Sequence, residues 1–154
     1  TTGHVRIDIL ELPKLKSMQL QTVQDKPITF SITDAASGGM PPYVFNLVRE
    51  SHAGTVHLNA DGTGTFQPAS GIAENAYFEF SVMDSRGGAS AVSGRADIVI
   101  HSPLNIAQET LLEVNEDANV ATDLTSAVSG SVAPYTFALV SEPSHGTAVI
   151  TTQG

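Results

Sequence analysis

The chain has 154 residues, of which 41% are apolar and 15% are charged, a composition that argues against disorder. Its net charge is −9, with seven lysines and arginines against sixteen acidic residues. We therefore expect no nucleic-acid partner, because phosphate neutralisation needs clustered cations. The sequence has no cysteine, which rules out disulfides and thiolate metal sites, and no apolar run long enough for insertion into a membrane as a helix.

The first twelve residues are predicted to belong to a module that precedes the main one. Apolar and polar side chains alternate from Val5 to Ile9, which is the two-residue period of a half-buried strand. Pro13 follows, and proline ends a strand because it has no N–H to donate to the ladder. A similar alternating segment that ends at Ile100 is also soon followed by a proline, at position 103. We therefore interpret residues 1–12 as a closing strand plus a linker.

Seven short segments with the same two-residue period follow, separated by turn-forming residues. The tripeptide Ala60–Gly62 lies between two of them and predicts a hairpin, because glycine readily supplies the positive φ of a tight turn. In the third segment, Val44 and Val48 add apolar residues to the face opposite Phe45, so we expect this strand in the centre of a sheet. The segments are 17–23, 27–33, 43–48, 54–59, 63–66, 77–83 and 91–100.

Seven short alternating strands within about 100 residues, with no sustained helical period, are typical of an all-β, immunoglobulin-like sandwich. We therefore expect residues 13–101 to form one complete seven-stranded module. The cysteines and tryptophan that mark antibody domains are absent from the sequence. The apolar faces of the strands supply the predicted core, which consists of Ile28, Phe30, Ile32, Tyr43, Phe45, Leu47, Val56, Leu58, Phe66, Phe78, Phe80, Val82, Ile98 and Ile100.

Residues 42–62 are repeated at 134–154, 92 positions later, with nine identical pairs and no gap. Repetition at a fixed spacing indicates tandem modules, and this spacing suits a sandwich module of roughly 100 residues. Residues 102–154 are therefore predicted to be the first half of a second, truncated module. A half-sandwich exposes its apolar edges, so we expect this part to fold poorly unless another chain completes it.

Three stretches carry a resemblance to a known family. Val114–Asp117 (VNED), Pro134–Val149 (PYTFALVSEPSHGTAV) and Phe78–Gly87 (FEFSVMDSRG) resemble the cadherin-like, tandem-95-type immunoglobulin-like repeats of large bacterial surface adhesins. Those repeats typically show an NED opening, a P-x-H-G-T segment and a closing F-x-Y-x-V-x-D-x-x-G, and Phe80 stands here where tyrosine is common. The resemblance implies an extracellular or cell-surface adhesin or matrix protein whose stiffness depends on calcium.

Six acidic residues are candidate calcium ligands, and four of them are expected at the end where the chain enters the module. Calcium takes six to eight oxygens, several of them from carboxylates. These four carboxylates could cage a cation at a junction between modules. The alternative is that Asp84 simply begins a glycine-containing turn and that the other carboxylates are solvated. The four residues are Glu11, Asp25, Asp34 and Asp84, and the resemblance adds Glu116 and Asp117.

No catalytic motif is present, so we expect the chain not to be an enzyme. The five histidines lack metal-ligand spacing, and the serines lack a G-x-S-x-G elbow. The leading hypothesis is a non-catalytic structural spacer of a secreted or cell-surface adhesin or fibre-forming protein, with neighbouring repeat modules as its partners. One alternative is a carbohydrate- or protein-binding accessory module of a large secreted enzyme, for which Tyr77 is the candidate aromatic residue. Another alternative is self-association into a filament by exchange of the strand at 5–10.

Overall fold

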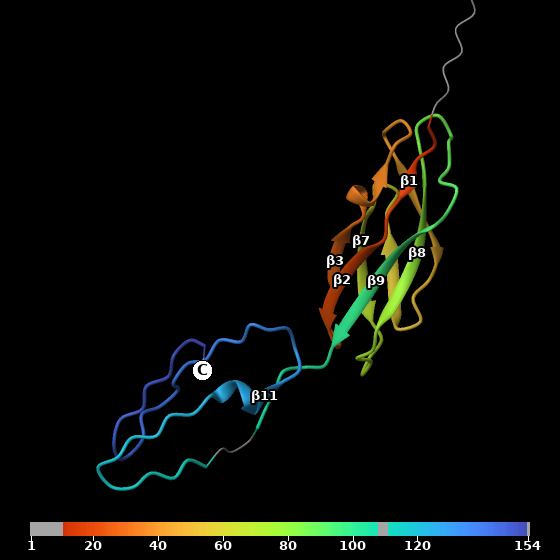
Figure 1. Ribbon diagram of the computed structural model, residues 1–154. Helices are drawn as coiled ribbons and strands as arrows, with labels where there is room; N and C mark the ends of the chain where they lie inside the picture. The colour runs from red at the N-terminus through yellow and green to blue at the C-terminus, as the bar shows by residue number, and fades with distance from the viewer. Residues whose placement is uncertain (1–10, 108–110, 154) are drawn as a thin grey trace, which may run out of the picture. The chain divides into compact units, whose positions relative to one another are not determined.

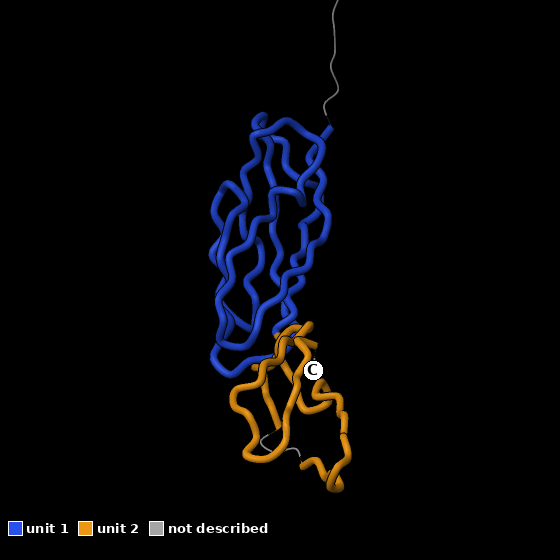
Figure 2. Tube along the Cα trace, turned by 90° about the vertical axis from the view of Figure 1, so that its left-hand side faces the viewer, with its two compact units in different colours: residues 1–100 blue, residues 101–154 orange. Residues whose placement is uncertain are grey.

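The computed structural model describes residues 11–107 and 111–153, and the chain divides into two compact units, residues 1–100 and 101–154 (Figure 2). The strand predicted within residues 5–10 lies outside the described residues. The described strands and 3-10 turns are β1 (Lys14–Leu15), β2 (Met18–Val23), β3 (Ile28–Ser31), η1 (Thr33–Ala35), β4 (Ala36–Ser37), β5 (Val44–Arg49), β6 (Gly54–Leu58), β7 (Thr63–Pro68), β8 (Ala76–Met83), β9 (Gly94–His101), β10 (Asn105–Ile106), η2 (Leu124–Ala127) and β11 (Val128–Ser129).

Unit 1 has two main sheets and one short strand pair, β1 with β4 (Figure 1). One main sheet has four strands in the order β2-β9-β8-β5, and the other has three strands in the order β3-β7-β6. Strands β5 and β9 both run antiparallel to β8, and strands β3 and β6 both run antiparallel to β7. The all-β, immunoglobulin-like sandwich that the alternating segments predict is thereby confirmed.

The core lies between the sheets because each strand turns every second side chain inward. Phenylalanines fill its middle: the ring centroids of Phe30 and Phe78 lie 5.3 Å apart, and those of Phe45 and Phe80 lie 6.5 Å apart. At such separations an aromatic pair adds about 0.5–1.5 kcal/mol beyond the area it buries. Most of the predicted core residues are buried, and four lie at its margin and are only partly buried. These four are Ile28, Tyr43, Leu47 and Leu58.

The prediction that the strand at 43–48 is central is wrong. Strand β5 lies at the edge of the four-stranded sheet, and Val44 and Val48 are 38% and 53% exposed. The register with β8 shifts between Leu47 and Arg49, so a bulge interrupts the alternation on which the prediction rested. Bulges are frequent at sheet edges, where they discourage pairing with a further strand.

The predicted hairpin joins β6 to β7, and its turn also fastens the two sheets to each other. The Gly62 carbonyl accepts the N–H of Ile32 at 2.8 Å, and the Ala60 carbonyl accepts the N–H of Phe45 at 2.9 Å. Ile32 follows β3 and Phe45 belongs to β5, so the turn holds one strand of each sheet. Gly62 has a φ of 86°, and a Cβ at this position would lie 2.9 Å from the Phe45 ring. Glycine is therefore required here both for conformation and for space.

The inner strands of both sheets come last in the sequence. Strands β2 and β5 flank the four-stranded sheet, and strands β3 and β6 flank the three-stranded sheet. The positions between them are taken by β7, β8 and β9. Each of the earlier sheet strands therefore depends on a later strand for its ladder.

In unit 2, the described residues contain one short strand pair, β10 with β11, each of two residues. By their match to the first four strands of the main module, segments 110–114, 120–124, 134–140 and 146–151 are predicted to be strands, but they form no strand where the structure describes them. Their counterparts in unit 1 are edge strands, which pair with β7–β9. The described residues of unit 2 include no counterpart of those inner strands, so these segments find no ladder partner among them.

Local features of unit 1 nevertheless recur in unit 2 at the same spacing of 92 positions. The Tyr43 hydroxyl donates to the Gly38 carbonyl, and the Tyr135 hydroxyl donates to the Gly130 carbonyl. Gly38 and Gly130 both have positive φ, 69° and 77°. The antiparallel pair β10–β11 likewise takes the place that the pair β1–β4 has in unit 1, with β11 following β4 by 92 positions and β10 following β1 by 91.

Candidate functional site

Asp84 is a buried carboxylate at the end of β8, only 7% exposed, where the chain turns toward β9. Its Oδ1 accepts from the N–H of Arg86 at 3.0 Å and from the N–H of Gly88 at 2.7 Å. Its Oδ2 accepts from the N–H of Met40 at 3.1 Å. Asp84 also begins a turn through its backbone, since its N–H donates to the Gly88 carbonyl at 2.8 Å. The carboxylate thus joins this turn to the loop that precedes β5.

The surroundings of Asp84 favour its ionised form. Burial by itself raises the pKa of the Asp84 carboxyl. The N–H groups of Gly88, Met40 and Arg86, with the Arg86 charge, outweigh burial and hold the pKa below its usual value. Asp84 is therefore a carboxylate whose charge is already stabilised by the protein's own backbone.

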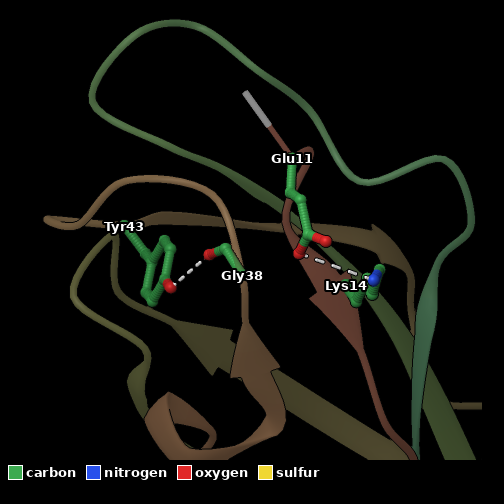
Figure 3. A network of polar contacts seen from close by, with 4 residues as sticks. All are labelled: Glu11, Lys14, Gly38 and Tyr43. Atoms are coloured by element: carbon green, nitrogen blue, oxygen red, sulfur yellow. Dashed lines mark hydrogen bonds and ion pairs between the residues drawn. The ribbon is translucent and has the colours of Figure 1, made fainter. Parts of the chain in front are cut away.

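Glu11 and Asp34 lie at the same end of unit 1 as Asp84, but they do not complete a ligand set with it. The Glu11 carboxylate pairs with the Lys14 ammonium at 3.6 Å, and both side chains are more than 70% exposed (Figure 3). Asp34 is exposed in η1. Figure 3 also shows the Tyr43 hydroxyl directed at the Gly38 carbonyl, so this backbone oxygen already has a donor.

Asp25 lies at the opposite end of unit 1, so the expectation that it accompanies Asp84 is wrong. Strand β2 runs from the chain entry to the far end of the sandwich, and Asp25 follows it in the turn to β3. There the Asp25 carboxylate accepts from the N–H of Gly71 at 3.0 Å, in the connection between β7 and β8. The length of one strand therefore separates Asp25 from the other three predicted ligands.

Glu116 and Asp117 are both exposed in unit 2, where Asp117 has a φ of 59° in a turn closed by the N–H of Ala118 donating to the Asn115 carbonyl at 3.1 Å. Among the residues that the structure describes, no three acidic or histidine side chains gather as a metal site requires. Calcium takes six to eight oxygens. The described residues around Asp84 do not fit such a cage, because its oxygens face N–H donors. Calcium at Glu116 and Asp117 stays a prediction.

Tyr77, the candidate aromatic of a sugar-binding surface, is covered by arginines on the outer face of the four-stranded sheet. The Arg95 guanidinium carbon lies 3.9 Å from the ring centroid and that of Arg49 lies 5.3 Å away. Asp97 holds Arg95 in this position, with Nη2 to Oδ1 at 2.6 Å. A sugar ring would have to displace a stacked guanidinium, so Tyr77 is not an open stacking platform.

One hydrogen-bond partner of Asp84 is not predictable from the residues around it. The Gly88 donor is signalled locally, because the stretch DSRGG reads as an aspartate-initiated turn. Met40 lies 44 residues earlier and contributes only its backbone N–H. Because almost every residue type has this group, the residue type itself gives no sign of the contact. The neighbouring pair Gly38-Gly39 was the available signal, since a Cβ at Gly39 would lie 2.9 Å from Asp84 Oδ2.

Comparison with known proteins identifies the main module. The family model described as a bacterial Ig domain matches residues 12–94, which include β1 to β8 and the first residue of β9. This match covers more than half of the chain. No curated protein matches the sequence.

Proposed function

Because the chain belongs to the bacterial Ig domain family, we infer that it is a non-catalytic structural repeat module, a spacer in a secreted or cell-surface adhesin or fibre-forming protein. Domains of this family are typically found on extracellular or surface proteins. No helix in the part of the chain that the structure describes is long and apolar enough to cross a membrane. The partners of such a module are its neighbours in the same protein.

The observation that carries this proposal is the path of the chain through unit 1. The chain enters beside the loop of Gly38, because Lys14 of β1 pairs with Ser37 of β4. It leaves through β9 at the other end, because Ile98, near the close of β9, pairs with Ala76, the first residue of β8 (Figure 1). Entry and exit at opposite ends let modules follow one another along a line without doubling back.

Two further features support an array. The turn of Gly38 and the Tyr43 hydrogen bond recur at Gly130 and Tyr135, which is expected if residues 102–154 begin a second copy of the module. The connection between β9 and β10 has three residues, Ser102–Leu104, and includes a proline. Short linkers with proline are stiffer than glycine- or serine-rich ones, which suits a spacer.

Small-angle scattering on proteins that carry one, two and four copies of the module tests the spacer role. An eight-residue strand such as β8 spans about 26 Å at about 3.3 Å per residue. Each added copy is therefore expected to lengthen the maximum dimension by at least about that amount. A maximum dimension that grows only as the cube root of the mass would indicate collapsed modules and contradict the proposal.

The two alternative roles predict different results. A carbohydrate-binding module would give specific hits on a glycan array that are lost in Tyr77→Ala, whereas a spacer gives none. Self-association by strand exchange would give a mass that rises with concentration in sedimentation equilibrium. The edge of β5 disfavours such pairing, because its Phe45 N–H is already bonded to Ala60 and a bulge follows.

A further inference from the structure

We propose that Asp84 and three backbone N–H groups form an internal latch at the chain-entry end of unit 1, and that this latch takes the place of a calcium ion. In a calcium cage the cation neutralises carboxylates and ties the loops that carry them. Here the N–H groups of Met40, Arg86 and Gly88 perform both tasks. The end therefore keeps its structure without calcium.

The donor geometry makes Asp84 unsuitable as a calcium ligand. Both oxygens are engaged, Oδ1 by Arg86 and Gly88 and Oδ2 by Met40. The N–H groups converge on the carboxylate, so their positive ends occupy the space from which a cation would approach. A calcium ion that took over these oxygens would deprive three N–H groups of their acceptor in a partly buried site.

The latch joins two segments that are distant in sequence by bonds in both directions. The Met40 N–H donates to Asp84 Oδ2, and the Met40 carbonyl accepts from Ser85, at 2.9 Å from its N–H and 3.0 Å from its hydroxyl. The loop before β5 and the turn after β8 are thus held together on both sides of Met40. A bound ion would add no connection that is not already made between these two segments.

Two glycines leave room for the Asp84 carboxylate, because a side chain at either position would crowd its oxygens. A Cβ at Gly39 would lie 2.9 Å from Asp84 Oδ2, and a Cβ at Gly88 would lie 3.1 Å from both oxygens. Gly39 also has a φ of 64°, which side chains rarely adopt. The backbone of both segments is therefore shaped around the carboxylate itself.

Glu11 is another acidic residue close to this loop, since its Oε2 lies 3.6 Å from where a Cβ of Gly38 would be. This carboxylate is exposed and paired with Lys14. One solvated carboxylate beside a lysine supplies too few oxygens to compete with water for calcium. Glu11 therefore serves as the matched control, since it is an acid at the same end outside the latch.

The test measures the full chain by NMR and thermal unfolding, in millimolar calcium chloride and in EDTA. The amide signals of Met40 and Gly88 report on the latch directly. In the unsubstituted protein we expect these signals and the Tm of unit 1 to be the same in both buffers. Asp84→Asn is expected to lower the Tm by about 5–15 °C in either buffer. It is also expected to speed hydrogen exchange at the Met40 N–H by at least about tenfold.

Glu11→Gln is expected to change neither the Tm nor the exchange rate. Calcium-dependent shifts of the Met40 and Gly88 signals, lost in Glu11→Gln or Asp84→Asn, would reveal a cation site and overturn the proposal. An unchanged Met40 exchange rate in Asp84→Asn would overturn it as well. If Asp84→Asn does not fold, the calcium titration of the unsubstituted protein decides alone. None of these outcomes depends on the spacer role, which scattering tests separately.

Discussion

Replacing Gly62 with alanine is expected to destabilise unit 1 by about 2–5 kcal/mol. An alanine held at a φ of 86° costs about 1–2 kcal/mol, because its Cβ crowds its own backbone. The Cβ would also lie 2.9 Å from the Phe45 ring and 3.2 Å from the Thr33 methyl. Relieving such overpacking costs about 1–3 kcal/mol more. Urea unfolding, followed by the amide signals of β8, should show a midpoint lower by at least about 1 M at constant slope.

Gly87→Ala is the matched control, because it separates the cost of conformation from the cost of the clash. Gly87 has a φ of 82°, close to that of Gly62, but a Cβ there would meet nothing within 4 Å. We therefore expect Gly87→Ala to cost only about 1–2 kcal/mol. Equal losses in the two variants would show that the Phe45 ring does not constrain position 62.

Three further substitutions test other parts of the fold. Phe80→Ala, which empties a fully buried position, should lower the free energy of unfolding by about 3–5 kcal/mol in the same titration. Arg95→Ala removes a guanidinium stacked on Tyr77 at a half-exposed site and should cost about 0.5–1 kcal/mol, less than any core truncation. The Thr63 hydroxyl and N–H lower the pKa of Asp61, so Asp61 stabilises the fold above about pH 4 and loses this effect as the pH falls through its lowered pKa. Asp61→Asn should therefore lower the urea midpoint at pH 7 and flatten its decline in acid, and a decline as steep as in the unsubstituted protein would exclude Asp61 as a contributor.

The features predicted correctly from the sequence are those encoded by neighbouring residues. The alternation around Phe78 and Phe80 specifies which face of β8 is buried, and Ala60–Gly62 specifies a tight turn. Both signals are local, because they depend on side-chain period and on the conformational freedom of glycine. The place of β5 in its sheet is not local. Val44 and Val48 satisfy the pattern of a central strand, yet the bulge and the sheet order leave them exposed.

In the candidate site, too, the local features can be predicted from the sequence and the contacts between distant residues cannot. The turn that Asp84 begins can be predicted from five consecutive residues. The Met40 N–H, which completes the hydrogen bonding of the Asp84 carboxylate, comes from another part of the chain. Asp25 lies apart from Asp84 because the six residues of β2 carry the chain to the other end of the sandwich before Asp25 is reached. The topology predicted from the sequence therefore places one carboxylate too many at this end of the sandwich.

The late position of the inner strands has a consequence for synthesis on the ribosome. When the nascent chain has emerged only as far as Gly62, it holds β2, β3, β5 and β6, and none of these has its neighbour in either sheet. Assembly must wait for the last 39 residues up to His101, within which β7, β8 and β9 lie. Until then the apolar faces of four strands are exposed to other nascent chains. The rate at which residues 63–101 are translated therefore determines how long the incomplete module can aggregate.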